Sequence, residues 1–214
     1  MTRLTHNLLL LPVFLVLFSV SFVNAEITAD NNPLEKYLQG LDTFRSGFEQ
    51  ILYNEYGEEL EKSVGVVYLK QPGKFHWAYW EPFSQFLISN GVTLWIYDED
   101  LEQVIISNIS ESIEDTPASI LTGDVDLNDH YVFIDGGESD GINWMELTPK
   151  DIQSQYRAIN LGFRGDELVS MQLFDNLENK TQINFLDSKR NVTLEYSLFD
   201  FMPPEGVDII DGRQ

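Results

Sequence analysis

Residues 86–97 decide the fold of this chain and read Phe86-Leu87-Ile88-Ser89-Asn90-Gly91-Val92-Thr93-Leu94-Trp95-Ile96-Tyr97. Two short runs, rich in aromatic and β-branched residues, flank the pair Asn90-Gly91, which is the strongest short-range signal for a two-residue hairpin turn. Both runs are apolar at successive positions, whereas a sheet with one solvated face would alternate apolar and polar residues. The stretch therefore predicts an antiparallel hairpin that is covered on both faces.

Further short strands are predicted on both sides of this hairpin. Turn-forming residues, such as Gly136-Gly137 and Arg164-Gly165-Asp166, separate the later runs at a spacing of about 10–12 residues. The predicted strands span residues 44–53, 64–69, 75–80, 86–89, 93–97, 103–107, 131–135, 144–148, 156–163, 168–174 and 181–186. This pattern predicts one mainly β (α+β) domain with a large antiparallel sheet, as a sheet, sandwich or barrel.

Two helices are expected to interrupt the sheet. Apolar residues recur at three- and four-residue steps between Pro33 and Thr43, which predicts a short amphipathic helix. Thr116-Pro117 is typical of a capped helix start, and Gly123 of its end.

The first 25 residues have the pattern of a secretory signal peptide. Arg3 precedes a nearly unbroken apolar run over residues 8–23, and Val23-Asn24-Ala25 suits a cleavage site. The alternative, a membrane anchor, is disfavoured because the run is short and contains Pro12. We expect residues 1–25 to be removed and residues 26–214 to form a single domain outside the cytosol.

Composition excludes several classes of function. With 13 Lys+Arg against 35 Asp+Glu, the net charge of −22 argues against binding to nucleic acid or to an anionic membrane surface. The absence of cysteine rules out disulfides, thiolate metal sites, a catalytic thiol and a lipid-modified cysteine. The aromatic content of 13% is too high for a disordered acidic chain.

The sequence does not indicate an enzyme or a cofactor. His76 lies in an aromatic strand and His130 in an acidic stretch, and neither has the nucleophile and acid pattern of a triad. No glycine-rich phosphate loop or G-x-S-x-G elbow is present. Residues 124–135 resemble a calcium loop, but Asp129 stands where glycine is needed and Asp135 where glutamate is needed. A solvated acidic loop is the better interpretation, and no metal is predicted.

Apolar density is the remaining signal. Aromatic residues crowd the strand Phe75-His76-Trp77-Ala78-Tyr79-Trp80 and the strand 93–97. Such strands suit either a thick two-layer core or a curved sheet that encloses an apolar ligand, and periodicity alone leaves both open.

Four segments, in order, resemble the LolA family of periplasmic outer-membrane lipoprotein carriers. They are residues 69–77 (Leu-Lys-Gln-Pro-Gly-Lys-Phe-His-Trp), 89–97 (Ser-Asn-Gly-Val-Thr-Leu-Trp-Ile-Tyr), 115–117 (Asp-Thr-Pro) and 199–208 (Phe-Asp-Phe-Met-Pro-Pro-Glu-Gly-Val-Asp). The resemblance covers residues 34–211. It implies an incomplete β-barrel with helices as a lid over a hydrophobic cavity, acting as a monomeric carrier. It also implies a cycle in which lipoprotein comes from the inner-membrane ABC transporter LolCDE and passes to the outer-membrane receptor LolB.

The resemblance also assigns residues. Family members typically carry Arg before the proline of the first segment, where it holds the lid, whereas this chain has Gln71. The matching lid positions are Leu38, Leu121 and Thr122. Glutamine donates hydrogen bonds without charge assistance, so we expect a looser lid than in the family. Phe75 and Trp77 share strand parity with Gln71 and are expected to line the cavity with Ile120 and Leu121, unless they are plain core.

Three other functions share parts of this pattern. LolB has the same architecture but is anchored through a lipidated cysteine, which this chain lacks. A secreted lipocalin-like barrel would bind a small apolar ligand without protein partners. A sensor domain of the same fold would detect stray lipoproteins.

Overall fold

The computed structural model describes residues 32–109, 117–122 and 127–213. Within them, twelve strands form one sheet in the order β12-β6-β5-β4-β3-β2-β1-β11-β10-β9-β8-β7. The strands are β1 (Thr43–Tyr53), β2 (Glu59–Lys70), β3 (Lys74–Glu81), β4 (Gln85–Asn90), β5 (Thr93–Asp98), β6 (Gln103–Asn108), β7 (Tyr131–Ser139), β8 (Ile142–Pro149), β9 (Tyr156–Arg164), β10 (Glu167–Asp175), β11 (Lys180–Arg190) and β12 (Asp208–Asp211). The helices are α1 (Pro33–Leu38), α3 (Pro117–Thr122), α4 (Leu127–His130) and the 3-10 helix η2 (Tyr196–Phe199).

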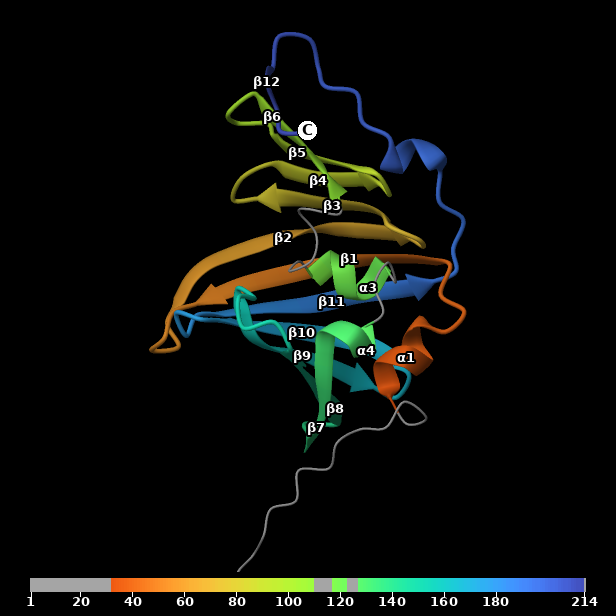
Figure 1. Ribbon diagram of the computed structural model, residues 1–214, viewed down its shortest axis with the longest axis vertical. Coiled ribbons are helices and arrows are strands. Elements are labelled where there is room, and N and C mark those ends of the chain that lie inside the picture. Colours follow the sequence, from red (N-terminus) through yellow and green to blue (C-terminus); the bar gives the residue numbers. More distant parts are fainter. Residues whose placement is uncertain (1–31, 110–116, 123–126, 214) are drawn as a thin grey trace, which may run out of the picture.

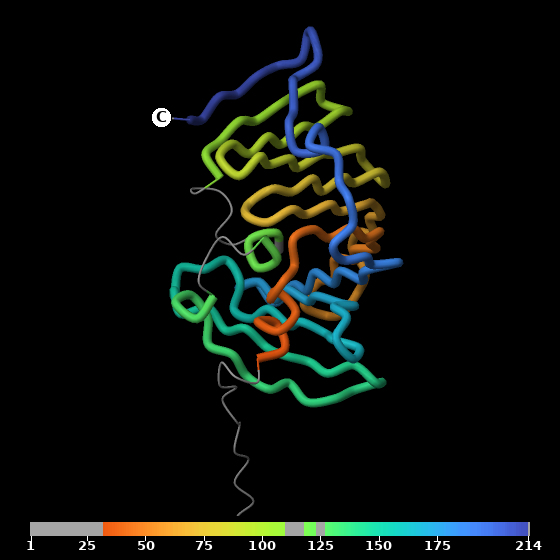
Figure 2. Tube along the Cα trace, turned by 90° about the vertical axis from the view of Figure 1, so that its right-hand side faces the viewer, coloured from red at the N-terminus to blue at the C-terminus, as the bar shows by residue number. Residues whose placement is uncertain are grey.

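The predicted large antiparallel sheet that does not close into a complete barrel is confirmed. All strand pairs are antiparallel except β12 with β6, and the sheet order begins at β12 and ends at β7. The sheet is strongly curved, and α1, α3 and α4 all lie on its concave side (Figure 1). Figure 2 shows the same helices gathered on one side of the sheet. The helices and the concave face therefore enclose one interior.

The predicted hairpin at Asn90-Gly91 forms as the sequence indicates. The Asn90 side-chain oxygen accepts hydrogen bonds from the backbone N–H groups of Val92 and Thr93, at 3.0 and 2.9 Å. Gly91 has a φ of 91°, a conformation that costs glycine little. This turn sets Ser89 opposite Leu94 and gives β4 and β5 their register.

Strand β1 joins the two halves of the sheet, because it pairs with β2 on one side and β11 on the other. Within this joint, Phe48 lies opposite Gly65 on β2 and Phe185 on β11. A Cβ atom at Gly65 would lie 1.9 Å from the carbonyl oxygen of Ala78 and 2.8 Å from the Phe48 ring. Only glycine therefore fits at this position of β2.

The helical predictions need correction. The helix that begins at Pro33 ends at Leu38, not Thr43, because Gly40 adopts a φ of 70° and Thr43 already belongs to β1. Its start is capped by the Asn32 side chain, which accepts from the N–H of Leu34 at 2.9 Å. The second helix forms as α3, while α4, η2 and β12 were not predicted. The expected acidic loop is wrong at residues 127–130, which are helical, whereas residues 131–135 begin β7 as the strand prediction for them indicates.

Side chains alternate between the two faces of each strand, so each face of the sheet carries its own apolar cluster. The larger one, the inner cluster, lies between the concave face and the helices and contains residues such as Phe48, Phe75, Trp77, Ile120 and Leu121. The smaller one, the outer cluster, lies on the opposite face; it consists of Ile88, Trp95, Val104 and Ile106, with Phe86, Tyr97, Phe201 and Val207 packed against them. Residues 191–207 run along the first half of the sheet to β12 and cover the outer cluster (Figure 1). Both faces of β4 and β5 are therefore covered, as the hairpin sequence predicts.

Candidate apolar binding site under the helix α3

The inner face of β3 presents its aromatic side chains to the interior. Phe75 and Trp77 are 2% and 4% exposed, and both belong to the inner cluster. The Phe48 ring lies 5.3 Å from the Trp77 ring and 5.1 Å from the Tyr79 ring, between centroids. The Tyr79 hydroxyl donates to Gln50 Oε1 at 3.1 Å, and burial raises the pKa of this phenol. The result is an aromatic wall with its one phenol hydrogen-bonded.

Helix α3 covers this wall. Ile120 and Leu121 are 0% and 1% exposed and belong to the same cluster as Phe75 and Trp77. The helix lies against β2 and β3. The structure thus brings together the four residues that the sequence assigns to a cavity. All four side chains are buried in the inner cluster.

Gln71 connects the sheet to α3. Its side-chain Nε2 donates to the carbonyl oxygen of Leu121 at 3.4 Å, close to the upper limit for a hydrogen bond. Its backbone N–H donates to the carbonyl oxygen of Asp42 at 2.9 Å, which fixes the position of the residue independently of the side chain. The contact between the Gln71 side chain and α3 is therefore a single long hydrogen bond between neutral groups.

The two other expected lid positions have different surroundings. Leu38 is partly buried and packs on the inner cluster from the end of α1. Thr122 is fully buried, and its hydroxyl donates to the carbonyl oxygen of Ser119 within α3. Of the three expected lid positions, Leu121 is the one that accepts a hydrogen bond from the Gln71 side chain within the described part of the chain.

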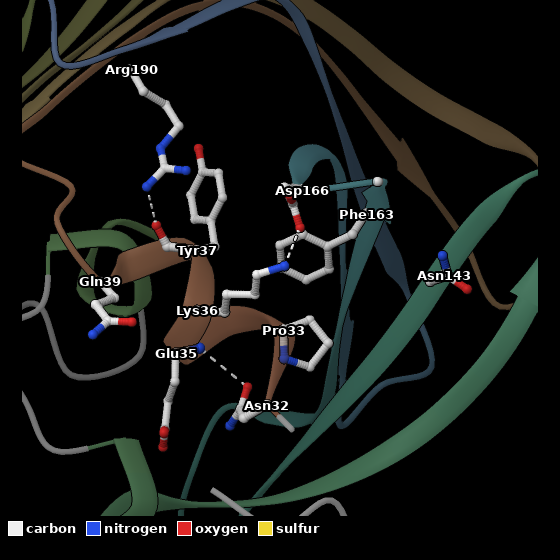
Figure 3. Close-up of a pocket in the computed structure, with 11 residues that line it drawn as sticks. Asn32, Pro33, Glu35, Lys36, Tyr37, Gln39, Asn143, Phe163, Asp166 and Arg190 are labelled. Carbon is white, nitrogen blue, oxygen red and sulfur yellow. Dashed lines mark hydrogen bonds and ion pairs between the residues drawn. The ribbon is translucent and has the colours of Figure 1, made fainter. Parts of the chain in front are cut away.

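A pocket of about 800 Å³ lies beside α1, on the other half of the sheet (Figure 3). It is lined by Asn32, Pro33, Glu35, Lys36, Tyr37, Gln39, Asn143, Phe163, Gly165, Asp166 and Arg190. Its wall is mixed in character, since charged groups stand beside the rings of Tyr37 and Phe163, which also belong to the inner cluster. Sequence reasoning missed this pocket, because its residues come from four separate segments.

Two contacts at this pocket hold α1 on the sheet. Arg190 donates to the carbonyl oxygen of Tyr37 at 2.5 Å, and its guanidinium lies 4.6 Å from the centre of the Tyr37 ring. The Lys36 ammonium lies 2.6 Å from the Asp166 carboxylate, which lowers the pKa of this carboxyl group. Both members of the ion pair are exposed, so the pair adds little stability. The partly buried Arg190 contact is the stronger attachment.

A second pocket of about 350 Å³ lies under the C-terminal segment, between Lys74, Asn90, Tyr196, Ser197, Phe199 and Asp200. Beside it, the His76 ring nitrogen Nδ1 donates to the carbonyl oxygen of Leu198 at 2.9 Å. Burial lowers the pKa of His76. His76 therefore helps to hold η2 on the outer face, and His130 is exposed at the end of α4.

The described residues give no sign of a metal centre or a membrane helix. In residues 32–109, 117–122 and 127–213, no group of three or more His, Asp or Glu side chains is placed to hold a metal ion. In the same ranges, no helix has the length and apolarity that are needed to span a bilayer. The predicted signal peptide, residues 1–25, and the start of the acidic segment, residues 124–126, lie outside these ranges.

Comparison with known proteins matches most of the chain. The family model "Outer membrane lipoprotein carrier protein LolA" matches residues 39–202. The outer-membrane lipoprotein carrier protein of Methylococcus capsulatus is 34% identical over 201 residues, which are 94% of this chain and 97% of that one. Its counterpart in Azotobacter vinelandii is 35% identical over 199 residues, 92% and 96% of the two chains.

A solved structure supports the fold alone. The crystal structure of a conserved, uncharacterized protein from Thermus thermophilus matches with a TM-score of 0.53 at 13% identity, over 84% of this chain and 94% of that one. The family match covers residues 39–202, and the two relatives are matched over nearly their whole length. The chain belongs to the LolA family of outer membrane lipoprotein carrier proteins.

Proposed function

We propose that this chain is a periplasmic carrier that binds the acyl chains of lipoproteins between the concave face of its sheet and the helices α1 and α3. The observation that carries the proposal is the inner cluster, in which Phe75, Trp77, Ile120 and Leu121 form an apolar interior. The relatives are named as lipoprotein carriers, and this interior offers the chemistry that an acyl chain needs. Binding in such an interior needs no catalytic group.

Release must be possible as well as binding. Moving an acyl chain out of water is worth about 0.8 kcal/mol per CH₂, which amounts to roughly 10 kcal/mol for a long chain. The polar contacts that hold the cover of the interior include the hydrogen bond from Gln71 to Leu121 and the bond from Arg190 to Tyr37. The hydrogen bond from Gln71 adds little to this attachment, and we propose that the lid is looser than in relatives with arginine in place of Gln71.

The partners follow from the same chemistry. A carrier without an energy source must receive its cargo from a driven donor and lose it to an acceptor that binds the acyl chains better. The names of these partners come from the family resemblance: we propose the inner-membrane transporter LolCDE as donor and LolB as acceptor, with the carrier acting as a monomer. We also propose that residues 1–25 are a signal peptide, cleaved after Ala25, that directs residues 26–214 to the periplasm.

Incubation of the purified protein with spheroplasts tests the proposal. We expect lipoproteins to appear in the soluble fraction in a one-to-one complex with the protein, measured by size-exclusion chromatography and mass spectrometry. Leu121→Glu should abolish the complex, because it places a charge in the inner cluster. The matched control Ile152→Glu should keep it, since Ile152 is 97% exposed.

Two results would contradict this function. If free fatty acid alone copurifies with the protein, a lipocalin-like role is the better description. If neither lipoprotein nor fatty acid binds, the interior is an ordinary core.

A further inference from the structure

The indole of Trp77 has a buried hydrogen-bond donor, Nε1, that finds no acceptor in the described part of the chain. Trp77 is 4% exposed, and among the described residues no acceptor is hydrogen-bonded to its Nε1. Buried tryptophans usually find a partner for this N–H group, and a donor that loses water without gaining an acceptor is costly. The feature therefore calls for a functional explanation.

The neighbours of Trp77 that the structure defines are apolar. Its cross-strand neighbours are Val67 on β2 and Leu87 on β4, and the Phe48 ring packs against it. Tyr79, two residues along the same face, has its hydroxyl bonded to Gln50. On this aromatic wall, which α3 covers, the Tyr79 hydroxyl is therefore paired, and among the described residues the Trp77 N–H is not.

We propose that the Trp77 indole N–H donates a hydrogen bond to a carbonyl oxygen of an ester- or amide-linked acyl chain, so that the interior distinguishes acyl chains from alkyl chains. The inference rests on the proposed function and names the part of the cargo that is recognised. An acyl chain has one strong acceptor, its carbonyl oxygen, next to an apolar tail. A lone donor in an apolar wall matches that combination, and the bond would relieve the cost of the unpaired N–H.

A pair of ligands that differ only in this acceptor provides the test. The first is a diacylglyceryl lipopeptide with two ester-linked octanoyl chains, and the second is its dioctyl ether analogue. We expect wild-type protein to bind the ester on the order of threefold to tenfold more tightly by titration calorimetry, the range for one net hydrogen bond. In Trp77→Phe, affinity for the ester should fall to that for the ether.

Trp95→Phe is the matched control, because Trp95 is also buried but belongs to the outer cluster. It should keep the wild-type preference for the ester. The change in the ester-to-ether ratio between variants isolates the Trp77 contact from any general difference between the two lipids.

A measurement on the wild-type protein keeps the test independent of how Trp77→Phe folds. The indole ¹H–¹⁵N resonance of Trp77 should move downfield with the ester ligand and stay in place with the ether. Equal affinities together with an unmoved resonance would overturn the acyl-specific contact and leave the carrier function intact. Failure of both ligands to bind would overturn the carrier function itself.

Discussion

The hydrogen bond from Gln71 to Leu121 predicts how readily α3 leaves the sheet. Gln71→Leu removes the donor and keeps most of the side-chain volume, whereas Gln71→Arg supplies a cationic donor. The bond is 3.4 Å long and joins neutral groups, so we take the low end of the range for one hydrogen bond, about 0.5 kcal/mol. This value corresponds to roughly a twofold change in the open population. Charge assistance about doubles such a bond, so arginine should shift the population by a similar factor in the opposite direction.

A single introduced thiol measures this equilibrium, because the chain has no cysteine of its own. Ala118 is 4% exposed on α3, and Ala118→Cys changes its volume little. When reclosing is faster than labelling, the rate of modification by a thiol reagent is proportional to the open population. We expect Gln71→Leu to speed labelling about twofold and Gln71→Arg to slow it about twofold.

The control is Gln182→Leu on β11, which removes an amide whose bond to Asn184 lies away from α3. It should leave the labelling rate unchanged. The reasoning would be refuted if labelling were the same in wild type, Gln71→Leu and Gln71→Arg. An equal effect from Gln182→Leu would show that global stability, not the contact with α3, sets the rate.

Three further expectations concern stability. Leu121→Ala should lower the free energy of unfolding by about 2–5 kcal/mol in urea titrations, while Leu101→Ala, at 69% exposure, should change it by less than about 0.5 kcal/mol; equal losses would contradict the placement of α3. Gly65→Ala should prevent soluble expression because its Cβ would meet the Ala78 carbonyl, whereas Gly47→Ala, with its nearest contact at 3.5 Å, should be tolerated; a folded Gly65→Ala protein would show that β2 and β3 are not packed as described. Burial holds the pKa of His76 below its ordinary value of 6.5, so the unfolded chain binds the proton first and stability should fall as pH drops below about 6.5. His76→Gln should remove this component of the pH dependence, and an unchanged profile would argue against the burial of His76.

The sheet could be predicted from the sequence because its strongest signals are local. Asn90-Gly91 specifies a turn, and the runs on either side carry their own strand preference. The hairpins could therefore be predicted without knowing which distant residues they contact. By contrast, Asp208-Ile209-Ile210-Asp211 is short and exposed, and only its pairing with β6 makes it a strand.

The site was predictable in part. Strand parity, together with the family resemblance, placed Phe75 and Trp77 on the face that α3 covers, although their contact with lipid stays a prediction. The pocket beside α1 could not be predicted from the sequence, because its contact between Arg190 and Tyr37 joins residues that are 153 positions apart in the chain. Nothing local in either segment indicates that pairing, and only the curvature of the whole sheet brings the two together.

The parallel pairing of β12 with β6 has a consequence for the newly made protein. One neighbour of β6 is β5, which precedes it directly in the sequence. The opposite edge of β6 pairs with residues 208–211, which are synthesised about a hundred residues later. Until they arrive, an apolar strand that contains Val104, Ile105 and Ile106 offers unpaired backbone groups to other chains. A growing chain of this protein is thus open to aggregation through its sixth strand until residues 208–211 cover that edge.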